Sequence, residues 1–353
     1  MDYKAISLKY RPQVLGEIVG QDRVVKSLGA ALQKQSIHHA YLFSGPRGVG
    51  KTSTARILAK SLNCVEGPTV KPCGVCNNCI EIKEGRSIDV IEIDGASNRG
   101  IDEVRALREN VKFSPVNSRY KVYIIDEVHM LTEPAFNALL KTLEEPPQHV
   151  RFVLATTHVH KLPPTILSRC QKFSFSLVPA GLIVERLKRI AEAEQAGPVA
   201  EKVLFNVAKA SGGSIRDAES VFDQILSVVS HPDFVEHMYS FLGIIEESLL
   251  SEFFLQLARR RRVELLSLVD RVVSEGRDLG EFLRDIVEFA RNILLVKIEK
   301  SFIERVECSP ETKGVIVKFA AAFSEAALVA FIDECIESRR KGKAVESLRI
   351  PLE

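Results

Sequence analysis

The chain has 353 residues, of which 46% are hydrophobic and 27% charged, as expected for a soluble globular protein of about two or three domains. Its 48 Lys and Arg residues nearly balance its 46 Asp and Glu residues, so the formal net charge is only +2. A general polyanion-binding surface is not indicated, and any DNA contact has to come from a local patch. The sequence has no run of about eighteen apolar residues and no signal-peptide pattern, which favours a cytoplasmic protein.

The first half alternates short apolar runs with helical patterns. Residues 40–44, 89–94, 121–126 and 151–156 are rich in β-branched and aromatic side chains, and residues 52–62 have helical spacing. This alternation predicts an α/β domain with a parallel sheet covered by helices. Polar residues follow the runs at their carboxyl ends, where such sheets bind ligands.

The period changes from about residue 180. Apolar residues recur at helical spacing through residues 180–230, which predicts a small helical lid domain. Residues 231–353 are again helical in pattern, and their apolar stripes are interpreted as core packing. The predicted organisation is therefore an α/β domain over residues 1–179, a lid, and an all-α C-terminal domain.

A phosphate-binding loop follows the first predicted strand. Residues 45–52 read GPRGVGKT, and a predicted helix begins directly after them, which is the context that a P-loop requires. The glycines let backbone N–H groups wrap phosphates at the positive end of the helix dipole. We expect Lys51 to reach the β- and γ-phosphates of ATP and the Thr52 hydroxyl to ligate Mg²⁺. The candidate nucleotide-binding residues here are Gly45, Gly48, Val49, Gly50, Lys51, Thr52 and Ser53.

Two further strands end in residues suited to ATP hydrolysis. Asp126 and Glu127 end the run 121–126, where Asp126 is expected to hold Mg²⁺ and Glu127 to polarise the attacking water. Thr157 follows the next strand and is a candidate sensor of the γ-phosphate. Arg169 and Arg216 are candidates for stabilising charge during phosphoryl transfer, Arg169 in its own site or in that of a neighbour.

Four of the seven cysteines form a cluster in sequence. Cys64, Cys73, Cys76 and Cys79 have the spacing C-x8-C-x2-C-x2-C within a segment rich in Gly, Pro and Asn. Such spacing favours a structural tetrahedral Zn²⁺ site, with an iron–sulfur cluster as the rival interpretation. The remaining three are expected to be buried apolar thiols, namely Cys170, Cys308 and Cys335.

Taken together, these motifs resemble the gamma/tau clamp-loader subunits of bacterial DNA polymerase III, a family of AAA+ ATPases. The resemblance is strong over about residues 1–230 and weak beyond. The most specific stretches are residues 9–12 (KYRP), 19–21 (VGQ), 73–79 (CGVCNNC), 126–131 (DEVHML), 137–147 (NALLKTLEEPP) and 166–170 (ILSRC).

The resemblance implies roles that the residues alone leave open. It implies that Arg169 projects into the ATP site of an adjacent subunit and that Arg216 reads the γ-phosphate within its own. Tyr10, Arg11 and Val19 match the segment that lies along adenine and ribose. The family also implies a zinc-binding insertion, a C-terminal collar, and a five-membered ring of delta, delta-prime and further copies of this chain, acting on a sliding clamp and primer–template DNA.

Arg99, Arg105 and Lys141 are the candidates for DNA contact, although the first two flank Asp102 and Glu103 and fit a mixed solvated helix face equally well. The basic run 259–262 is interpreted as a solvated or subunit-facing patch.

Thr157 matches the family's first sensor, but after it the family often has an Asp-Pro pair, whereas this chain reads THVH over residues 157–160. This position is expected to affect local loop shape and not hydrolysis. Three alternatives remain: a delta-prime subunit, which lacks a working P-loop; an AAA+ protein remodeller, which usually has an aromatic pore loop; and a scaffold with a purely structural ATP site.

Overall fold

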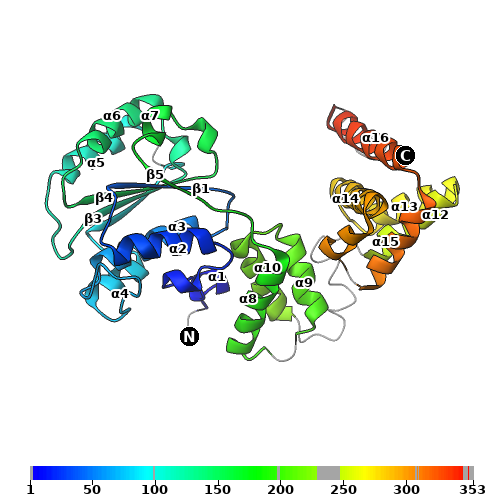
Figure 1. The fold of residues 1–353 in the computed structure, drawn as a ribbon, viewed down its shortest axis with the longest axis horizontal. Coiled ribbons are helices and arrows are strands. Elements are labelled where there is room, and N and C mark those ends of the chain that lie inside the picture. The colour runs from blue at the N-terminus through cyan, green and yellow to red at the C-terminus, as the bar shows by residue number, and fades with distance from the viewer. Residues whose placement is uncertain are drawn as a thin grey trace. The chain divides into compact units, whose positions relative to one another are not determined.

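The computed structural model describes residues 3–97, 100–196, 199–228, 247–306, 308, 310–344 and 349. The chain separates into two compact units, residues 1–227 and residues 228–353. The first unit contains a sheet with its covering helices and a group of lid helices, and the second is helical throughout its described residues (Figure 1).

The first unit is built on a five-stranded parallel sheet with the order β2-β3-β4-β1-β5. Its strands are β1 (Ala40–Ser44), β2 (Val90–Asp94), β3 (Lys121–Asp126), β4 (Val150–Thr156) and β5 (Gln171–Ser174). The predicted parallel sheet is confirmed, and β4 lies between β1 and β3. In the register, Ser44 lies opposite Thr156 and Asp94 opposite Asp126, so the polar carboxyl ends of the strands share one edge.

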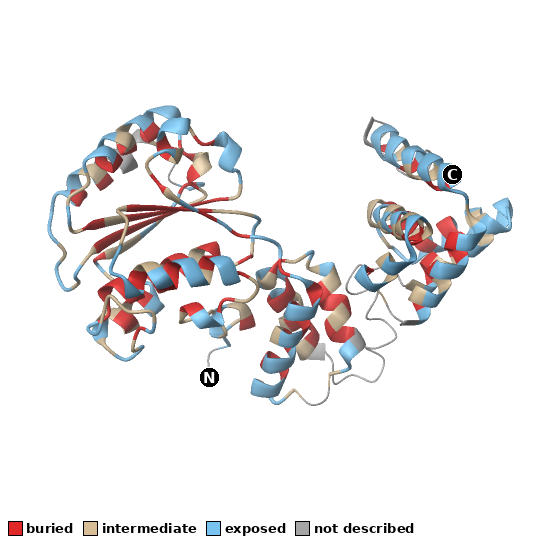
Figure 2. Ribbon diagram, in the orientation of Figure 1, coloured by how far each residue is buried: buried red, intermediate tan, exposed pale blue. Residues whose placement is uncertain are grey.

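Helices cover both faces of the sheet (Figure 1). One face carries α2 (Asp22–Gln33), α3 (Lys51–Asn63) and α4 (Asn77–Glu84), and the other carries α5 (Ile101–Val111), α6 (Glu133–Glu144) and α7 (Pro164–Leu167). Alternate residues of β1 serve the two cores: Tyr41 and Phe43 pack on the α3 side, and Ala40 and Leu42 on the α6 side. The central strands β1, β3 and β4 are buried almost throughout (Figure 2), as two-sided coverage requires, whereas the edge strands β2 and β5 are partly exposed.

Short elements complete this unit. They are the helix α1 (Ile6–Lys9) and the 3₁₀ turns η1 (Leu15–Glu17), η2 (Val128–Met130) and η3 (Val159–Lys161). The predicted lid helices are present as α8 (Ala180–Ala193), α9 (Glu201–Ala210) and α10 (Ile215–Val228). Leu187, Val207 and Phe222 are buried, one on each of these three helices.

The second unit is a helical domain with an aromatic core. Its elements are α12 (Glu247–Ala258), α13 (Arg262–Ser274), α14 (Leu279–Ile298), η4 (Lys300–Arg305), α15 (Pro310–Ala322) and α16 (Glu325–Ala344). The ring of Phe254 is fully buried and packs against Phe289, Phe319 and Phe331. Among the described residues, no single helix is long and apolar enough to cross a membrane. Only α15 and α16 taken together reach that length and apolar composition, and they are bent by 110° at the break between them.

Candidate nucleotide-binding site and zinc site

The P-loop leaves β1 and opens α3, as the sequence predicts. Gly45 has φ 148° and Gly48 has φ 74°, a backbone region that favours glycine. A Cβ atom at Gly45 would lie 2.3 Å from the carbonyl oxygen of Phe175, and one at Gly48 would lie 1.9 Å from Ser214 Oγ. Glycine at these two positions therefore lets the loop pass close to β5 and to the lid.

Lys51 is the first residue of α3 and is folded back onto the loop. Its ammonium donates to the carbonyl oxygens of Gly45 (2.8 Å) and Pro46 (2.6 Å), and the residue is only 6% exposed. Burial lowers the pKa of Lys51, against the opposing influence of Glu127 and Asp126. Phosphate oxygens are stronger acceptors for this ammonium than backbone carbonyls, because the hydrogen bond is then assisted by charge on both partners.

Thr52 and Asp126 connect the P-loop with the end of β3. The Thr52 hydroxyl donates to Asp126 Oδ2 at 2.5 Å, so a side-chain oxygen from the start of α3 and one from the end of β3 already lie together. Hard oxygen donors of this kind are what Mg²⁺ prefers, and the ion normally keeps several waters and binds substrate phosphates as well. The pair therefore fits the magnesium position that the sequence predicts.

Glu127 follows Asp126 in a left-handed conformation, with φ 45°. Its Oε2 atom accepts from the backbone N–H (3.1 Å) and from the hydroxyl (2.9 Å) of Thr157. His129 Nδ1 lies 3.3 Å from the same oxygen, and the His129 side chain is nearly buried. All of these contacts involve Oε2, and none of them involves the other carboxylate oxygen, Oε1.

His158 contacts both Thr157 and His129, which its position in the sequence does not reveal. Its Nδ1 is 2.8 Å from Thr157 Oγ1, and its ring centroid is 4.7 Å from that of His129. Because the Thr157 hydroxyl donates to Glu127, its oxygen is free to accept from an N–H of His158. The residue that departs from the family pattern thus contacts the candidate sensor directly.

A cavity of about 460 Å³ lies beside the P-loop. The sequence-predicted residues among its lining are Arg11, Val19, Gly48, Val49, Gly50, Lys51, Thr52, Ser53, Asp126, Glu127 and Arg216. Tyr10, Gly45, Thr157 and Arg169 lie outside the lining. Residues that sequence reasoning did not single out also line it: Arg47, Glu92, Asp94, Arg186 and Glu219. Glu92 and Asp94 carried a signal, since both lie at the carboxyl end of a predicted strand, whereas Arg186 and Glu219 resemble ordinary charged residues of amphipathic helices.

The lid reaches the P-loop through the start of α10. The backbone N–H of Arg216 donates to Gly48 O at 3.3 Å, and the Ser214 side chain accepts from Asp217 N–H at 3.3 Å. Ser214 therefore acts as the N-cap residue of α10. Arg216 is placed on the cavity wall by this cap and by the loop contact.

Arg169 has a different environment. It follows α7, and its guanidinium donates to Glu144 Oε1 (2.7 Å) and to Thr165 O (2.8 Å). Its side chain is 32% exposed, in contrast to the enclosed Lys51. An arginine so placed is held in a defined orientation at the surface.

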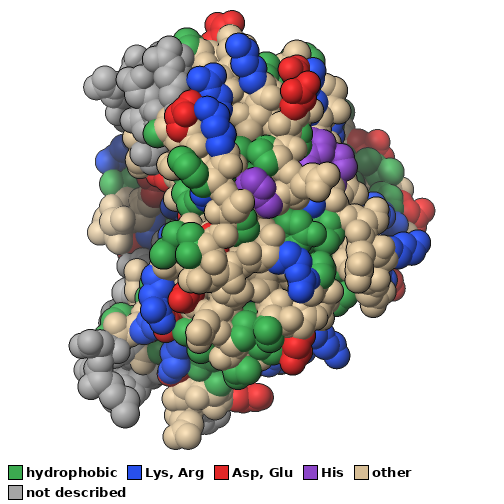
Figure 3. Space-filling model, turned by 90° about the vertical axis from the view of Figure 1, so that its left-hand side faces the viewer, with side chains coloured by type: hydrophobic (Ala, Val, Ile, Leu, Met, Phe, Trp, Pro, Cys, Tyr) green, Lys and Arg blue, Asp and Glu red, His purple; other side chains and the backbone are tan. Residues whose placement is uncertain are grey.

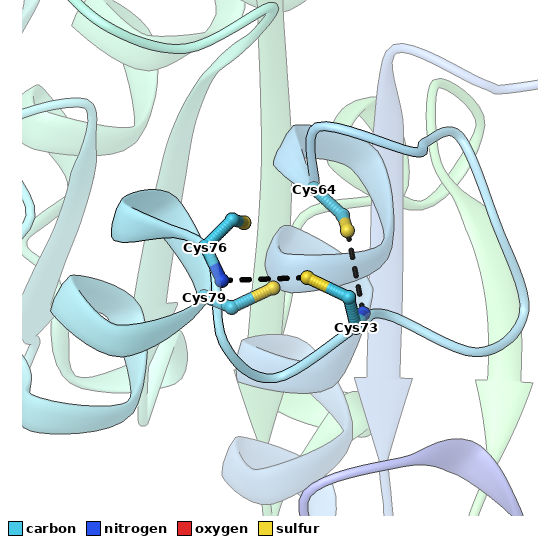
Figure 4. A group of neighbouring side chains, drawn as sticks. All are labelled: Cys64, Cys73, Cys76 and Cys79. Atoms are coloured by element: carbon cyan, nitrogen blue, oxygen red, sulfur yellow. Dashed lines mark hydrogen bonds between the residues drawn. The ribbon is translucent and has the colours of Figure 1, made fainter.

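The four clustered cysteines converge in space (Figure 4). Their sulfur atoms lie within 4.8 Å of one another, and all seven cysteines of the chain are free thiols. A tetrahedral Zn²⁺ site with Zn–S bonds of about 2.3 Å needs sulfurs about 3.8 Å apart, so the cluster fits zinc with a small contraction. Backbone N–H groups of Cys73 and Cys76 donate to the sulfurs of Cys64 and Cys73, each at 3.4 Å, and such contacts stabilise thiolates.

The other cysteines and the DNA candidates give mixed outcomes. Cys170 and Cys335 are buried as predicted, whereas Cys308 is only partly buried at the edge of the second core. Of the candidates for DNA contact, Lys141 is exposed on α6. Arg99 and the side chain of Arg105 lie outside the described residues. Acidic and basic side chains are interspersed on the face shown in Figure 3, in keeping with the balanced net charge.

Comparisons with known proteins match both units. A family model described as "DNA polymerase III, delta subunit" matches residues 20–179, and one described as "DNA polymerase III subunits gamma and tau domain III" matches residues 235–342. The chain is 44% identical over 297 residues to DNA polymerase III subunit tau of Bacillus subtilis, covering 84% of this chain and 53% of that protein. It is 41% identical over 296 residues to DNA polymerase III subunit gamma of Buchnera aphidicola, covering 83% of this chain and 81% of that protein. Among solved structures, the Thermotoga maritima RuvB Holliday junction branch migration motor has a TM-score of 0.49 at 21% identity, over 76% of this chain and 86% of that chain.

The strand order, the P-loop on β1 and the helical lid define a nucleotide-binding protein of the AAA+ class. The comparisons identify the branch of that class. The chain belongs to the gamma/tau family of DNA polymerase III subunits. It spans about half the length of the tau relative and four fifths of the gamma relative.

Proposed function

We propose that this chain is the ATP-hydrolysing motor subunit of a bacterial clamp loader. ATP binding would shape a ring that opens the sliding clamp and grips primer–template DNA, and hydrolysis would release both. The observation that carries the proposal is the junction of the P-loop with the acidic end of β3, where Thr52 donates to Asp126 at 2.5 Å and Glu127 lies next in the chain. A delta-prime subunit would lack a working P-loop, so this junction favours the motor.

Each polar group at the sheet edge has a proposed task. Lys51 would exchange its carbonyl partners for the β- and γ-phosphate oxygens of ATP, and Glu127 would polarise the attacking water through its unanchored oxygen. Thr157 would keep Glu127 oriented, because it donates twice to the other oxygen. Magnesium held by Thr52 and Asp126 would neutralise charge on the phosphates.

The two arginines would act from different subunits. Arg216 lines the cavity of its own chain, so it is suited to read the γ-phosphate there. Arg169 lies outside that cavity and is oriented by Glu144, which suits an arginine that completes the site of an adjacent subunit. We accordingly propose assembly with delta, delta-prime and further copies of this chain in a five-membered ring.

The same proposal covers the domain organisation and location. We propose an ATPase domain over residues 1–179 with a zinc-binding insertion at 64–79, a lid over 180–230 and an oligomerising collar over 231–353, in a cytoplasmic protein. Tyr10 and Arg11 would lie along adenine and ribose, with Val19 beside them. Lys141 would contact DNA from the exposed side of α6.

The decisive experiment measures ATP hydrolysis by this chain with its delta and delta-prime partners, sliding clamp and primed DNA. Clamp and primed DNA should stimulate the wild type strongly, and Arg169→Ala should abolish the stimulation. Arg86→Ala, which removes an exposed ion pair with Glu84, is the matched control and should behave like the wild type. If clamp and DNA leave the wild-type rate unchanged, the motor role is wrong.

Zinc is tested separately by elemental analysis of the purified chain. We expect about one zinc per wild-type chain and its loss in Cys79→Ser, with Cys335→Ser as a control that retains the metal. Iron in place of zinc, with the absorbance of a cluster, would support the rival interpretation.

A further inference from the structure

The N-terminal segment, residues 3–12, forms one wall of the nucleotide cavity. Its residues Ser7, Leu8, Arg11 and Pro12 all line the cavity, as Lys51 does. The segment contains just one helical turn, α1, and is therefore too short to hold its own conformation. Its position has to be set by the elements that it contacts.

Those contacts are made with the lid helices. The Tyr3 hydroxyl donates to Asp223 Oδ2 at 2.6 Å, and the Ile6 backbone N–H donates to the same atom at 3.1 Å. The Lys9 ammonium pairs with Glu194 Oε1 at 2.7 Å, just after α8. The segment is thus attached to α8 and α10 at several points along its length.

Arg186 and Glu219 form the central connection. Arg186 on α8 donates from Nε to Glu219 Oε1 on α10 at 3.1 Å, and its Nη2 donates to the backbone carbonyl oxygen of Tyr10. One guanidinium therefore joins two lid helices and the N-terminal segment. Both side chains line the cavity.

The pair is too deeply buried to be an ordinary surface ion pair. The Arg186 and Glu219 side chains are 15% and 5% exposed. Removing two charges from water costs several kcal/mol per ion, which the pair's mutual attraction only partly offsets. A buried charge pair on a cavity wall is therefore weak evidence for a role in stability and points to a role at the cavity.

One face of α10 relates this pair to both ends of a nucleotide. Arg216, Glu219 and Asp223 are spaced by three and four residues, so their side chains lie in a row along the helix. Arg216 is the candidate for the γ-phosphate, Glu219 holds the Arg186 joint, and Asp223 anchors residues 3 and 6. A single helix therefore bears the candidate phosphate contact, Arg216, and also holds the N-terminal segment (residues 3–12), which we call the base-side wall because Tyr10 and Arg11 are proposed to lie along adenine and ribose.

We propose that Arg186 and Glu219 are positioning residues for a nucleoside triphosphate. They hold the N-terminal segment to the lid, so that the base-side wall and the lid move as one body when Arg216 engages the γ-phosphate. The inference rests on the proposed function, because it assigns this cavity to ATP. It adds a coupling between recognition of the base and recognition of the terminal phosphate.

The test uses the full chain and measures binding of ATP and of ADP by calorimetry, together with kcat and KM for ATP. Arg186→Ala should weaken ATP binding about tenfold and raise KM, with kcat within about twofold of the wild type, since the hydrogen bonds it removes join the lid to the N-terminal segment and do not involve the residues assigned to hydrolysis. The preference of the wild type for ATP over ADP should shrink in the variant. Lys188→Ala on the same helix removes only the exposed pair with Glu201 and should bind like the wild type.

Asp223→Asn distinguishes positioning from direct contact. Asp223 does not line the cavity, yet it holds residues 3 and 6, so this variant should also weaken ATP binding, by about threefold, and speed hydrogen exchange in residues 3–12. Normal ATP binding by Asp223→Asn alongside weak binding by Arg186→Ala would overturn the coupling and leave Arg186 as a simple contact residue. Wild-type affinity in both variants would overturn the inference altogether. Failure of the wild type to bind ATP would instead defeat the proposed function.

Discussion

The two units bury different kinds of side chain. In the first unit the buried residues include charged ones, among them Lys51, Asp89 and Glu219, as well as the amide of Asn63. In the described part of the second unit, Thr312 is the one buried polar residue in a core dominated by Phe, Leu and Ile. The first unit thus fully buries charged side chains, whereas the described part of the second unit does not, its least exposed charged pair being Arg277 with Glu275 (12% and 41% exposed).

The buried charged side chains of the first unit have hydrogen-bond partners, which explains how the unit tolerates them. Asp89 accepts from the backbone N–H groups of Val116, Asn117 and Ser118, each at 2.8 Å. Lys51 is held by loop carbonyls and Glu219 by Arg186. The free-energy cost of burying a polar group is small where hydrogen bonds within the protein replace those to water. These residues therefore indicate where side chains of the first unit have a role other than core packing.

The largest effect is expected in the second unit. Phe254→Ala should lower the free energy of unfolding of that unit by about 3–5 kcal/mol, because the ring is fully buried among other aromatic rings. Far-UV circular dichroism during urea unfolding reports both units. The chain has no Trp, and five of its six tyrosines, Tyr3, Tyr10, Tyr41, Tyr120 and Tyr123, belong to the first unit, whereas Tyr239 belongs to the second. In a Tyr239→Phe background, used for all variants, tyrosine fluorescence therefore follows the first unit.

The contrast holds if the tyrosine transition of Phe254→Ala stays where it is in the wild type. Leu266→Ala, at a residue that is 44% exposed on α13, is the control and should cost less than about 1 kcal/mol. A tyrosine transition that shifts with Phe254→Ala would mean that the units unfold together.

The next effect concerns a polar group of the first unit. Asp89→Ala should destabilise that unit by about 3 kcal/mol, because three backbone N–H groups lose a charged acceptor. Asp89→Asn keeps one acceptor oxygen, so its free energy of unfolding should lie between those of Asp89→Ala and the wild type. Tyrosine fluorescence in urea is the measurement, and a loss below about 1 kcal/mol for the alanine variant would show that water replaces the carboxylate there.

Lys51→Ala should weaken ATP binding by about a hundredfold, or about 2.7 kcal/mol, since a charge-assisted contact with phosphate is lost. The nucleotide-free variant should be no less stable than the wild type, because burial lowers the pKa of Lys51 and so disfavours its charged form. The two expectations are checked by the melting temperature with and without ATP. An undiminished ATP-dependent rise in the variant would contradict the assignment of Lys51.

The smallest effect is a trend with pH at Glu219. Burial raises the pKa of Glu219 above its ordinary value of 4.5, so the folded state takes up the proton at a higher pH than the unfolded state. The resulting stabilisation is complete below pH 4.5 and is lost as pH rises through the raised pKa. Glutamine does not titrate, so the stability of Glu219→Gln relative to the wild type should increase with pH across that window. A difference independent of pH would place the folded pKa at its ordinary value.

Much of the first unit is predictable because its sequence signals are local. Apolar runs bounded by polar residues define two of its strands in the sequence. The expected strand 40–44 coincides with β1, and the expected strand 151–156 differs from β4 only by starting one residue later. The P-loop is likewise one continuous stretch. The cysteine spacing also sufficed to predict a cluster that closes in space.

The lid side of the cavity is different because its contacts are remote in sequence. Arg186 reaches a carbonyl 176 residues away, and its carboxylate partner is 33 residues away. Neither residue stands out from the charged face of an amphipathic helix. Likewise, the approach of His158 to Thr157 depends on the side-chain rotamers in a turn, which spacing does not determine.

The position of β1 in the sheet has a consequence for how the protein is made. This strand pairs with β4 and β5 and with neither β2 nor β3, so its first partner is synthesised more than 100 residues after it. On the ribosome, β2 and β3 are available to each other well before β1 has a neighbour. Because strand pairs that are distant in sequence are slow to form and leave edges exposed, the nascent chain carries the phosphate loop on an unpaired apolar strand until residue 156 has emerged. The phosphate-binding loop is therefore among the last parts of the sheet edge to reach its native surroundings.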